Sequence, residues 1–293
     1  MSEVFRTPDE RFAGLDGWAY EPRYLEQEGL RMHYVEEGAG DPILLLHGEP
    51  TWGYLYRQAM PALAAAGRVV APDYLGFGRS DKPTDGEWYT YDRHYRSIER
   101  LVAELGLERL TVVVHDWGGP IGLRLAVEHP EAVDRLVVLN TGIGAGRAPS
   151  DTWLRFRELV RRTGTELSAG RMVAAGCARG LSEEAMAAYD APFPTPESKT
   201  GLIAFPELVP TELDHPSAAA MQAVREALRR WQKPALVLFG DSDPIFPPDA
   251  AERMAALIPG AGPAETLARA GHFVQEDGGD ELGQRIASWL TTQ

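Results

Sequence analysis

The sequence predicts an α/β protein with a mostly parallel sheet, helices on both faces of that sheet, and an inserted helical cap. Two observations lead to this fold class. Short apolar runs alternate along the chain with segments of helical periodicity, a pattern typical of parallel sheets whose two faces are both buried. The alternation stops between about Ile143 and Ser217, where helical segments follow one another without a clear buried strand.

Five apolar runs predict the central strands. They are 42–46 before His47-Gly48, 68–71 before Pro72-Asp73, 110–114 before His115-Asp116, 136–139 before Asn140-Thr141-Gly142, and 235–239 before Gly240-Asp241. Helical patterns at 97–105, 121–128 and 218–231 lie between these runs. Because ligands bind outside the carboxyl ends of the strands in such sheets, we expect the functional site where these polar motifs meet.

The interrupted stretch predicts a cap, or lid, over the strand ends. Helical patterns cover 150–162, 169–179 and 182–189, and the proline-rich segment APFPTPESK follows. We therefore expect a core formed by residues 1–143 and 215–293 and a helical cap formed by residues 144–214. The alternative is that this segment only lengthens the fold.

Composition restricts the partners and the compartment. The formal net charge of -14 over 293 residues disfavours nucleic acids and anionic membrane surfaces as partners. Cys177 is the only cysteine, so an intrachain disulfide is impossible and a reducing compartment is favoured. Residues 1–12 lack a secretory pattern, and no apolar run reaches the roughly 20 residues that span a bilayer. We expect a cytoplasmic protein that is a monomer. We expect no metal or cofactor, because no metal-ligand cluster, phosphate loop or dinucleotide fingerprint occurs in the sequence.

The segment VVVHDWGGPIGLRLA (112–126) predicts a strand, a sharp turn and a helix. A nucleophile elbow has the pattern small-x-nucleophile-x-small on such a turn, and this pattern places Asp116 at the nucleophile position. Gly118 allows the helix to approach the strand closely, whereas Val114 is larger than the usual glycine. The alternative is that Asp116 only caps a helix that begins near Pro120.

Two further residues complete a catalytic pattern. Asp243 follows the strand at 235–239, and His272 lies in AGHFVQE near the C-terminus. Nucleophile, acid and histidine in this order are typical of α/β-hydrolases. Asp241 competes for the acid role, but Asp243 lies further into its loop and can turn back toward His272. We therefore predict Asp116, Asp243 and His272 as the triad.

An aspartate nucleophile indicates a particular chemistry. A carboxylate with a pKa of about 4 is ionised at neutral pH and needs no base. It suits displacement at a saturated carbon that carries a leaving group, and the product is an alkyl ester of Asp116. His272 is then free to deprotonate a water that hydrolyses the ester, while Asp243 stabilises the imidazolium. This reasoning favours the opening of a carbon–halogen bond or an epoxide.

The neighbours of the nucleophile suggest how charge is stabilised. Trp117 follows Asp116 directly, and its indole N–H is a donor suited to a departing halide. The backbone N–H groups of Trp117 and Glu49 face the expected oxyanion, and the Glu49 side chain is a candidate for positioning the hydrolytic water. The alternative for Trp117 is a purely packing aromatic.

Five motifs together resemble those of haloalkane dehalogenases in the α/β-hydrolase superfamily, in the subfamily with glutamate after His-Gly. They are HGEPTW (47–52), DYLGFGRSDKP (73–83), HDWGG (115–119), APFP (191–194) and AGHFVQE (270–276). The resemblance extends from about Phe5 to the C-terminus, although epoxide hydrolases share HDWGG. It implies an α/β-hydrolase fold and hydrolysis of haloalkanes to alcohol and halide through an aspartyl ester. By this resemblance Asp116 is the nucleophile, His272 the base, Asp243 the acid and Trp117 a halide ligand.

The resemblance also implies a second halide-binding tryptophan from the first cap helix. Trp153 is the candidate, but counting back from APFP places Phe156 nearer the expected position. The two residues lie about one turn apart on the same helix face. If Phe156 occupies the position, one halide donor is missing.

Other functions remain open from the sequence. An epoxide hydrolase with the same triad would by resemblance have two cap tyrosines, whereas the predicted cap contains only Tyr189. A fluoroacetate dehalogenase would place arginines near the nucleophile, where Trp117 stands. A ligand-binding or degenerate hydrolase on this fold is the remaining alternative.

Overall fold

The computed structural model describes residues 3–144, 146 and 149–293. In this part of the chain an eight-stranded sheet has the order β10-β9-β8-β7-β4-β5-β3-β2. Its strands are β2 (Arg23–Gln27), β3 (Leu30–Glu37), β4 (Pro42–Leu46), β5 (Arg68–Pro72), β7 (Leu110–His115), β8 (Val133–Leu139), β9 (Ala235–Gly240) and β10 (Glu265–Leu267). A separate antiparallel pair joins β1 (Val4–Phe5) and β6 (Lys82–Pro83).

The sheet is mostly parallel, as predicted. Every pair from β10 to β5 runs parallel, and only β3 pairs antiparallel with its neighbours β5 and β2. The chain order reverses at β4, which lies between β5 and β7. A reversal of this kind opens a crevice at the carboxyl ends of the strands, and the motifs that follow β4 and β7 end at this crevice.

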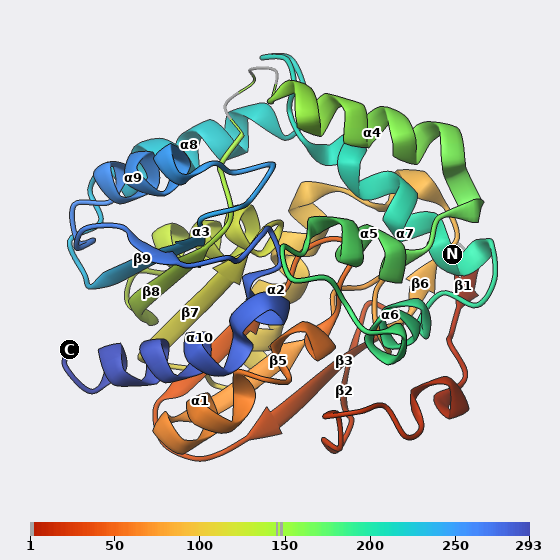
Figure 1. The fold of residues 1–293 in the computed structure, drawn as a ribbon, viewed down its shortest axis with the longest axis horizontal. Helices are drawn as coiled ribbons and strands as arrows, with labels where there is room; N and C mark the ends of the chain where they lie inside the picture. Colours follow the sequence, from red (N-terminus) through yellow and green to blue (C-terminus); the bar gives the residue numbers. More distant parts are fainter. Residues whose placement is uncertain (1–2, 145, 147–148) are drawn as a thin grey trace.

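Helices cover both faces of the sheet (Figure 1). In one group, α1 packs against α10. In the other group, α3 packs against both α2 and α8, and α9 packs against β9. The bounds are α1 (Met60–Ala66), α2 (Tyr91–Glu104), α3 (Gly118–Glu128), α8 (Ala218–Leu228), α9 (Pro248–Leu257) and α10 (Val274–Leu290). Short 3-10 helices occupy Asp9–Phe12, Gly53–Tyr56, Gly86–Trp88, Gly164–Glu166, Glu197–Lys199 and Phe205–Leu208.

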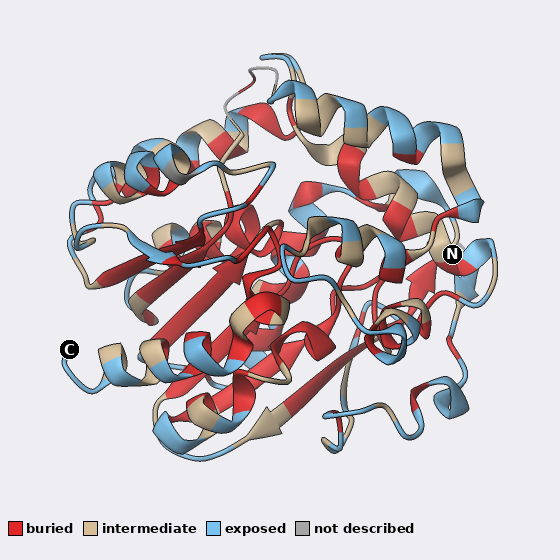
Figure 2. Ribbon diagram, in the orientation of Figure 1, coloured by how far each residue is buried: buried red, intermediate tan, exposed pale blue. Residues whose placement is uncertain are grey.

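The core is centred on the sheet. Every residue of β4, β7 and β9 is buried, and Figure 2 shows these strands as a continuous buried layer between half-exposed helices. Burial on both faces explains why the sequence shows these strands as unbroken apolar runs. The strand β2 lies at the sheet edge with β3 beside it, and both carry mixed polar residues, so the apolar pattern did not reveal them.

Between β8 and α8 the chain forms four helices in the described residues. They are α4 (Asp151–Thr163), α5 (Ala169–Gly176), α6 (Glu183–Asp190) and α7 (Thr200–Ala204). Figure 1 shows them beyond the carboxyl ends of the central strands. The predicted helices at 150–162, 169–179 and 182–189 agree with α4, α5 and α6. Residues 145, 147 and 148 of the predicted cap lie outside the described residues.

None of the helices in the described ranges is both long enough and apolar enough to cross a membrane.

Candidate active site

Asp116 occupies a sharp turn between β7 and α3. Its backbone has a φ of 48°, a conformation that non-glycine residues seldom adopt. Three contacts hold the turn: the Asp116 N–H donates to the Asn140 carbonyl at 3.2 Å, its carbonyl accepts from Gly119 N–H at 2.9 Å, and Thr141 Oγ1 donates to the same carbonyl at 2.6 Å. The helix α3 begins at Gly118 and no side chain caps it. The alternative that Asp116 serves as a helix cap is therefore wrong.

Two glycines allow this turn and the loop after β4 to lie close together. A Cβ at Gly118 would lie 2.2 Å from the Leu46 carbonyl oxygen, and a Cβ at Gly48 would lie 2.3 Å from Asp116 Oδ1. The strand β4 and the loop after it thus approach the elbow more closely than any larger residue permits. This approach brings the Glu49 backbone to the Asp116 carboxylate.

The Asp116 carboxylate has two different oxygen environments. Oδ1 accepts the Glu49 backbone N–H at 2.8 Å, whereas Oδ2 lies 3.6 Å from His272 Nε2. The side chain is 21% exposed, and it lines a cavity. Burial opposes ionisation, but the contacts with His272 and the Trp117 N–H outweigh it and keep the pKa of Asp116 below its usual value. The carboxylate is therefore anionic at neutral pH.

The structure brings Asp243, and not Asp241, to His272. Asp243 Oδ2 accepts from His272 Nδ1 at 3.0 Å and from Asn140 Nδ2 at 2.7 Å, and Oδ1 accepts the Ile245 N–H at 2.7 Å. Asp241 is exposed and accepts from the Ser242 hydroxyl. Burial opposes ionisation of Asp243, but His272, Asn140 and Ile245 lower its pKa.

His272 lies between two carboxylates. Burial opposes its protonation, but Asp243 and the contact with Asp116 outweigh this effect and raise the pKa of His272 to about 10. The ring stacks on Phe246, with centroids 5.8 Å apart. His115 Nε2 donates to the His272 carbonyl at 2.8 Å, so the strand that carries the nucleophile also positions the histidine loop.

Sequence reasoning missed two residues that support this arrangement. Asn140, at the end of β8, holds Asp243 and also accepts the Gly240 N–H at 3.0 Å. Asp277 accepts the N–H groups of Gly271 at 2.7 Å and Ala178 at 2.8 Å, and so ties the histidine loop to the segment after α5. Asn140 could have been found, because it stands in one of the polar motifs that end the predicted strands. Nothing local marks Asp277.

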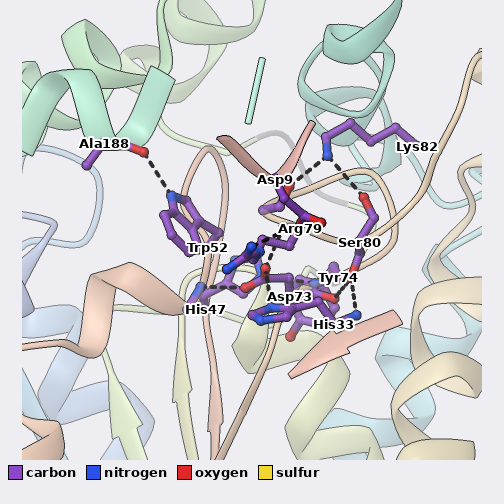
Figure 3. Close-up of polar contacts among 12 residues, drawn as sticks. Asp9, His33, His47, Trp52, Asp73, Tyr74, Arg79, Ser80, Lys82 and Ala188 are labelled. Carbon is purple, nitrogen blue, oxygen red and sulfur yellow. Dashed lines mark hydrogen bonds and ion pairs between the residues drawn. The ribbon is translucent and has the colours of Figure 1, made fainter. Parts of the chain in front are cut away.

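The loop that presents Glu49 rests on a buried polar network around Asp73 (Figure 3). Asp73 accepts from His33 Nδ1 at 2.8 Å and from the Gly53 N–H at 2.8 Å. His47 Nε2 accepts the Tyr74 N–H at 3.1 Å, so Nδ1 carries the proton and donates to the Gly48 carbonyl at 2.9 Å. These bonds fix the backbone on each side of Glu49.

The Glu49 side chain points into a buried environment. Only 7% of the residue is exposed, and Oε1 has no hydrogen-bond partner among the described residues. Burial, together with the nearby charge of Asp116, raises the pKa of Glu49 well above its usual value. The raised pKa favours the protonated form of Glu49 beside the ionised Asp116, and Oε1 is free to accept a hydrogen bond from a water or substrate group.

A cavity of about 310 Å³ opens over Asp116. Trp117 and Trp153 both line it, whereas Phe156 is not among its lining residues in the described part of the chain. Neither indole N–H donates to any described residue. Trp117 is 6% exposed and meets the edge of Phe205, so it has a packing contact and a free donor together. Pro149 and Pro210, from the two ends of the predicted cap, line the same cavity.

The described ranges hold no group of three or more His, Cys, Asp or Glu side chains arranged to bind a metal ion.

The strand order, the strand-turn-helix elbow, and the acid and histidine that approach it define an α/β-hydrolase. The family model described as alpha/beta hydrolase fold matches residues 41–279. Within that class, the chain belongs to the haloalkane dehalogenases. It is 47% identical to a haloalkane dehalogenase of Mycobacterium marinum over 98% of this chain and 99% of that protein. It is 40% identical to one of Psychrobacter cryohalolentis over 98% of each chain.

The solved structures agree. The fold is similar to that of a haloalkane dehalogenase from Paraglaciecola agarilytica, with a TM-score of 0.92 and 33% identity over 99% of this chain and 98% of that chain. The enzyme from Agrobacterium tumefaciens has a TM-score of 0.84 at 25% identity over 97% and 99% of the two chains. The fold and the family predicted from the sequence are thus confirmed.

Proposed function

We propose that this protein hydrolyses haloalkanes to an alcohol and a halide ion through a covalent ester on Asp116. One observation carries the proposal. An ionised carboxylate on the elbow faces a largely apolar cavity, with a backbone donor on one oxygen and His272 3.6 Å from the other. This arrangement suits attack on a saturated carbon followed by hydrolysis of the resulting ester.

In the first step Asp116 Oδ2 attacks the carbon that carries the halogen. The C–O bond forms as the C–halogen bond breaks, and the halide leaves with the bonding electron pair. Oδ1 stays in its hydrogen bond with the Glu49 N–H and becomes the carbonyl oxygen of the ester. The indole N–H groups of Trp117 and Trp153 are free to donate to the halide, which would otherwise be poorly solvated in an apolar cavity.

The ester changes the state of His272. The charge of Asp116 helps to raise the pKa of His272 to about 10, and alkylation removes that charge. The imidazolium then releases its proton to solvent more readily and becomes the base that the second step needs. The loss of charge on Asp116 thereby makes His272 able to act as a base.

In the second step water attacks the carbonyl carbon of the ester. His272 Nε2 accepts a proton from this water, and Asp243 stabilises the imidazolium through Nδ1. The tetrahedral oxyanion is held by the N–H groups of Glu49 and Trp117. Collapse breaks the C–O bond to the alcohol oxygen, which takes up a proton and leaves as the alcohol. Of the two protons of the water, one ends on the alcohol and the other on His272, so the Asp116 carboxylate is restored beside a protonated His272. Glu49, whose Oε1 has no partner among the described residues, would orient the water.

The segment 144–214 is proposed as the lid of this site. Pro149, Trp153 and Pro210 line the same cavity as Asp116, so this segment would exclude water during the displacement. The epoxide alternative is not favoured, because the hydroxyl of Tyr189 donates to Glu276 and Tyr189 does not line the cavity.

The test is the release of bromide from 1-bromohexane by the purified protein. Wild type should release bromide and hexanol in equal amounts, and Asp116→Ala should release neither. Asp243→Ala should lose most of the turnover, whereas Asp241→Ala, which removes an exposed carboxylate two residues away, should stay within a few-fold of wild type. The absence of bromide with wild type, or bromide release by Asp116→Ala, would contradict the proposal.

We also propose that the protein works as a cytoplasmic monomer. The single cysteine, Cys177, forms no disulfide and is partly buried, which fits a reducing compartment. The related enzyme of P. agarilytica is described as tetrameric, so light scattering at micromolar concentration is the appropriate test. A mass above that of one 32.2 kDa chain would contradict the monomer.

A further inference from the structure

Among the described residues, the cavity over Asp116 has one cationic side chain in its wall. Most of its lining is apolar, including Pro210, Met221 and Phe246, but the guanidinium-bearing Arg225 also lines it. Arg225 comes from the last turn of α8, an element separate from the elbow that carries Asp116. The pocket that receives the substrate thus contains both a nucleophilic carboxylate and a permanent positive charge.

Arg225 has no ionic or hydrogen-bonding partner among the described residues, although it is only half-exposed. Its neighbour Arg229, on the next turn, pairs with Glu226 at 3.2 Å, so the nearby carboxylate is already engaged. The guanidinium of arginine has five N–H donors in a planar arrangement. This arrangement matches the two oxygens of a carboxylate or phosphate, and the paired hydrogen bonds replace those that the guanidinium makes with water. An unpaired guanidinium that lines a ligand cavity is therefore available for an anionic ligand group.

The positive charge of Arg225 lies in a protein whose other charges are mostly negative. The chain carries a net charge of -14, and the ionised Asp116 faces the same cavity, so the field of the protein repels anionic substrates. A purely apolar haloalkane would need no cation in the wall. Arg225 offsets this repulsion locally and provides a directional contact for one anionic group.

We propose that Arg225 selects haloalkanes that carry a carboxylate at the end remote from the carbon–halogen bond. This inference rests on the proposed function and narrows its substrate class. The cavity of about 310 Å³ is roughly twice the ~150 Å³ that accommodates benzene, so it has room for an alkyl chain between the two charged ends. The carboxylate pairs with Arg225 while the halogen-bearing carbon meets Asp116 Oδ2.

The experiment compares two series of equal chain length. The substrates are 4-bromobutanoate, 6-bromohexanoate and 8-bromooctanoate, with the neutral 1-bromoalkanes of the same carbon number. Loss of a charge-assisted hydrogen bond predicts that Arg225→Gln lowers kcat/KM for the best bromoalkanoate about ten- to a hundredfold. The same variant should leave the neutral bromoalkane within about twofold, and Arg225→Lys should recover part of the loss.

Arg230→Gln is the matched control. It removes the same charge from an exposed position just after α8, and it should change neither series. If Arg225→Gln lowers both series equally, or leaves their ratio unchanged, the inference is overturned. An equal loss of kcat/KM for both series would mean that Arg225 contributes to halide release or to folding and not to substrate selection.

A binding measurement separates this inference from the proposed function. Hexanoate, which cannot react, should bind wild type and should bind Arg225→Gln about tenfold or more weakly, as measured by calorimetry. Hexanoate binding that depends on Arg225, without any bromide release, would support the anion site and contradict dehalogenation. Turnover of 1-bromohexane without Arg225-dependent hexanoate binding would overturn the anion site and leave dehalogenation intact.

Discussion

At the residue scale, the two proposed steps make opposite demands on His272. In the free enzyme its pKa is raised to about 10, because Asp243 and Asp116 outweigh the effect of burial, and the ion pair keeps Asp116 ionised. The second step needs the neutral ring. Because ester formation removes the charge of Asp116, the reaction itself supplies the change, and no separate conformational switch is required.

Replacing His272 with glutamine should stop the reaction after the first step. The ionised Asp116 needs no base, so His272→Gln should react with 1-bromohexane, release one equivalent of bromide and retain a hexyl group. Mass spectrometry of the intact protein and of the peptide containing Asp116 measures the adduct. The double variant Asp116→Ala/His272→Gln is the control and should show no mass increase. A His272→Gln protein that binds substrate without forming an adduct would mean that His272 acts before ester formation.

Removing the free indole donors should slow carbon–halogen cleavage. A hydrogen bond lost in a dry site costs about 1–3 kcal/mol, so Trp117→Phe should lower the single-turnover rate by one to two orders of magnitude or so. The effect should be larger for chloroalkanes than for bromoalkanes, because chloride is the poorer leaving group. Trp153→Phe should have a smaller effect of the same sign.

Phe156→Leu is the comparison for Trp153, because Phe156 lies about one turn away on α4 and does not line the cavity. It should leave the rate nearly unchanged. Equal rates for wild type and Trp117→Phe would remove Trp117 from the halide site.

At the element scale, the site depends on the close contact between β4 and the elbow that joins β7 to α3. The Glu49 N–H reaches Asp116 only because Gly48 and Gly118 have no side chain. The sheet order places β4 beside β7, so Glu49, the proposed oxyanion donor, and Asp116, the proposed nucleophile, come from neighbouring strand ends. Rigid strands thereby define the distance between groups that react together.

Gly118→Ala should destabilise the fold and disturb the oxyanion site together. The added Cβ would lie 2.2 Å from the Leu46 carbonyl, so strand β4 must move, and overpacking of this kind typically costs about 1–3 kcal/mol. Urea unfolding measures the loss, and activity of the folded fraction should also fall. Gly262→Ala is the control, since its Cβ would meet nothing within 4 Å, and it should change stability by less than about 0.5 kcal/mol. Similar losses in the two variants would contradict the close-contact argument.

At the scale of the whole molecule, buried histidines should determine how stability responds to acid. Burial lowers the pKa of His94 to about 3 and that of His115 to about 4, against about 6.5 in an unfolded chain. Between about pH 4 and 6.5 the unfolded chain therefore binds more protons than the native protein. The free energy of unfolding should rise with pH in this window, by about 1.4 kcal/mol per pH unit for each histidine, and be lost as the pH falls. His272, with its raised pKa, stabilises fully below about pH 6.5 and loses this contribution as the pH rises toward 10.

His94→Phe should reduce this acid sensitivity. The ring of His94 is buried among Tyr74, Tyr89 and Phe205, and neither of its nitrogens has a partner among the described residues. A phenylalanine ring should fit this position but cannot bind a proton. The slope of the unfolding free energy against pH should therefore fall by the contribution of about one proton. Urea unfolding between about pH 5 and about pH 7 measures the slope. An unchanged slope would show that His94 does not titrate between the native and unfolded states.

The fold class, the family and the turn that carries Asp116 could all be predicted from the amino-acid sequence. Apolar runs of β4, β7 and β9 are long and buried on both faces, so their pattern is readable without a structure. Asp116 and Asp243 could be singled out for the same reason, because each follows a strand that the sequence marks, whereas His272 was predicted from its motif near the C-terminus and from the order of the three residues. The edge strand β2 and its neighbour β3 carry polar residues among their apolar ones, so the apolar pattern did not predict them.

Which loop residues contact one another could not be predicted from local sequence patterns and is known from the folded chain. Asp243 rather than Asp241 reaches His272, because the loop after β9 folds back and Asn140, from another strand, holds the carboxylate there. Trp153 rather than Phe156 lines the cavity, because the rotation of α4 about its axis depends on packing that sequence spacing does not specify. Contacts between distant segments depend on loop paths and helix rotation, and these are set by the packing of the whole core rather than by any local pattern.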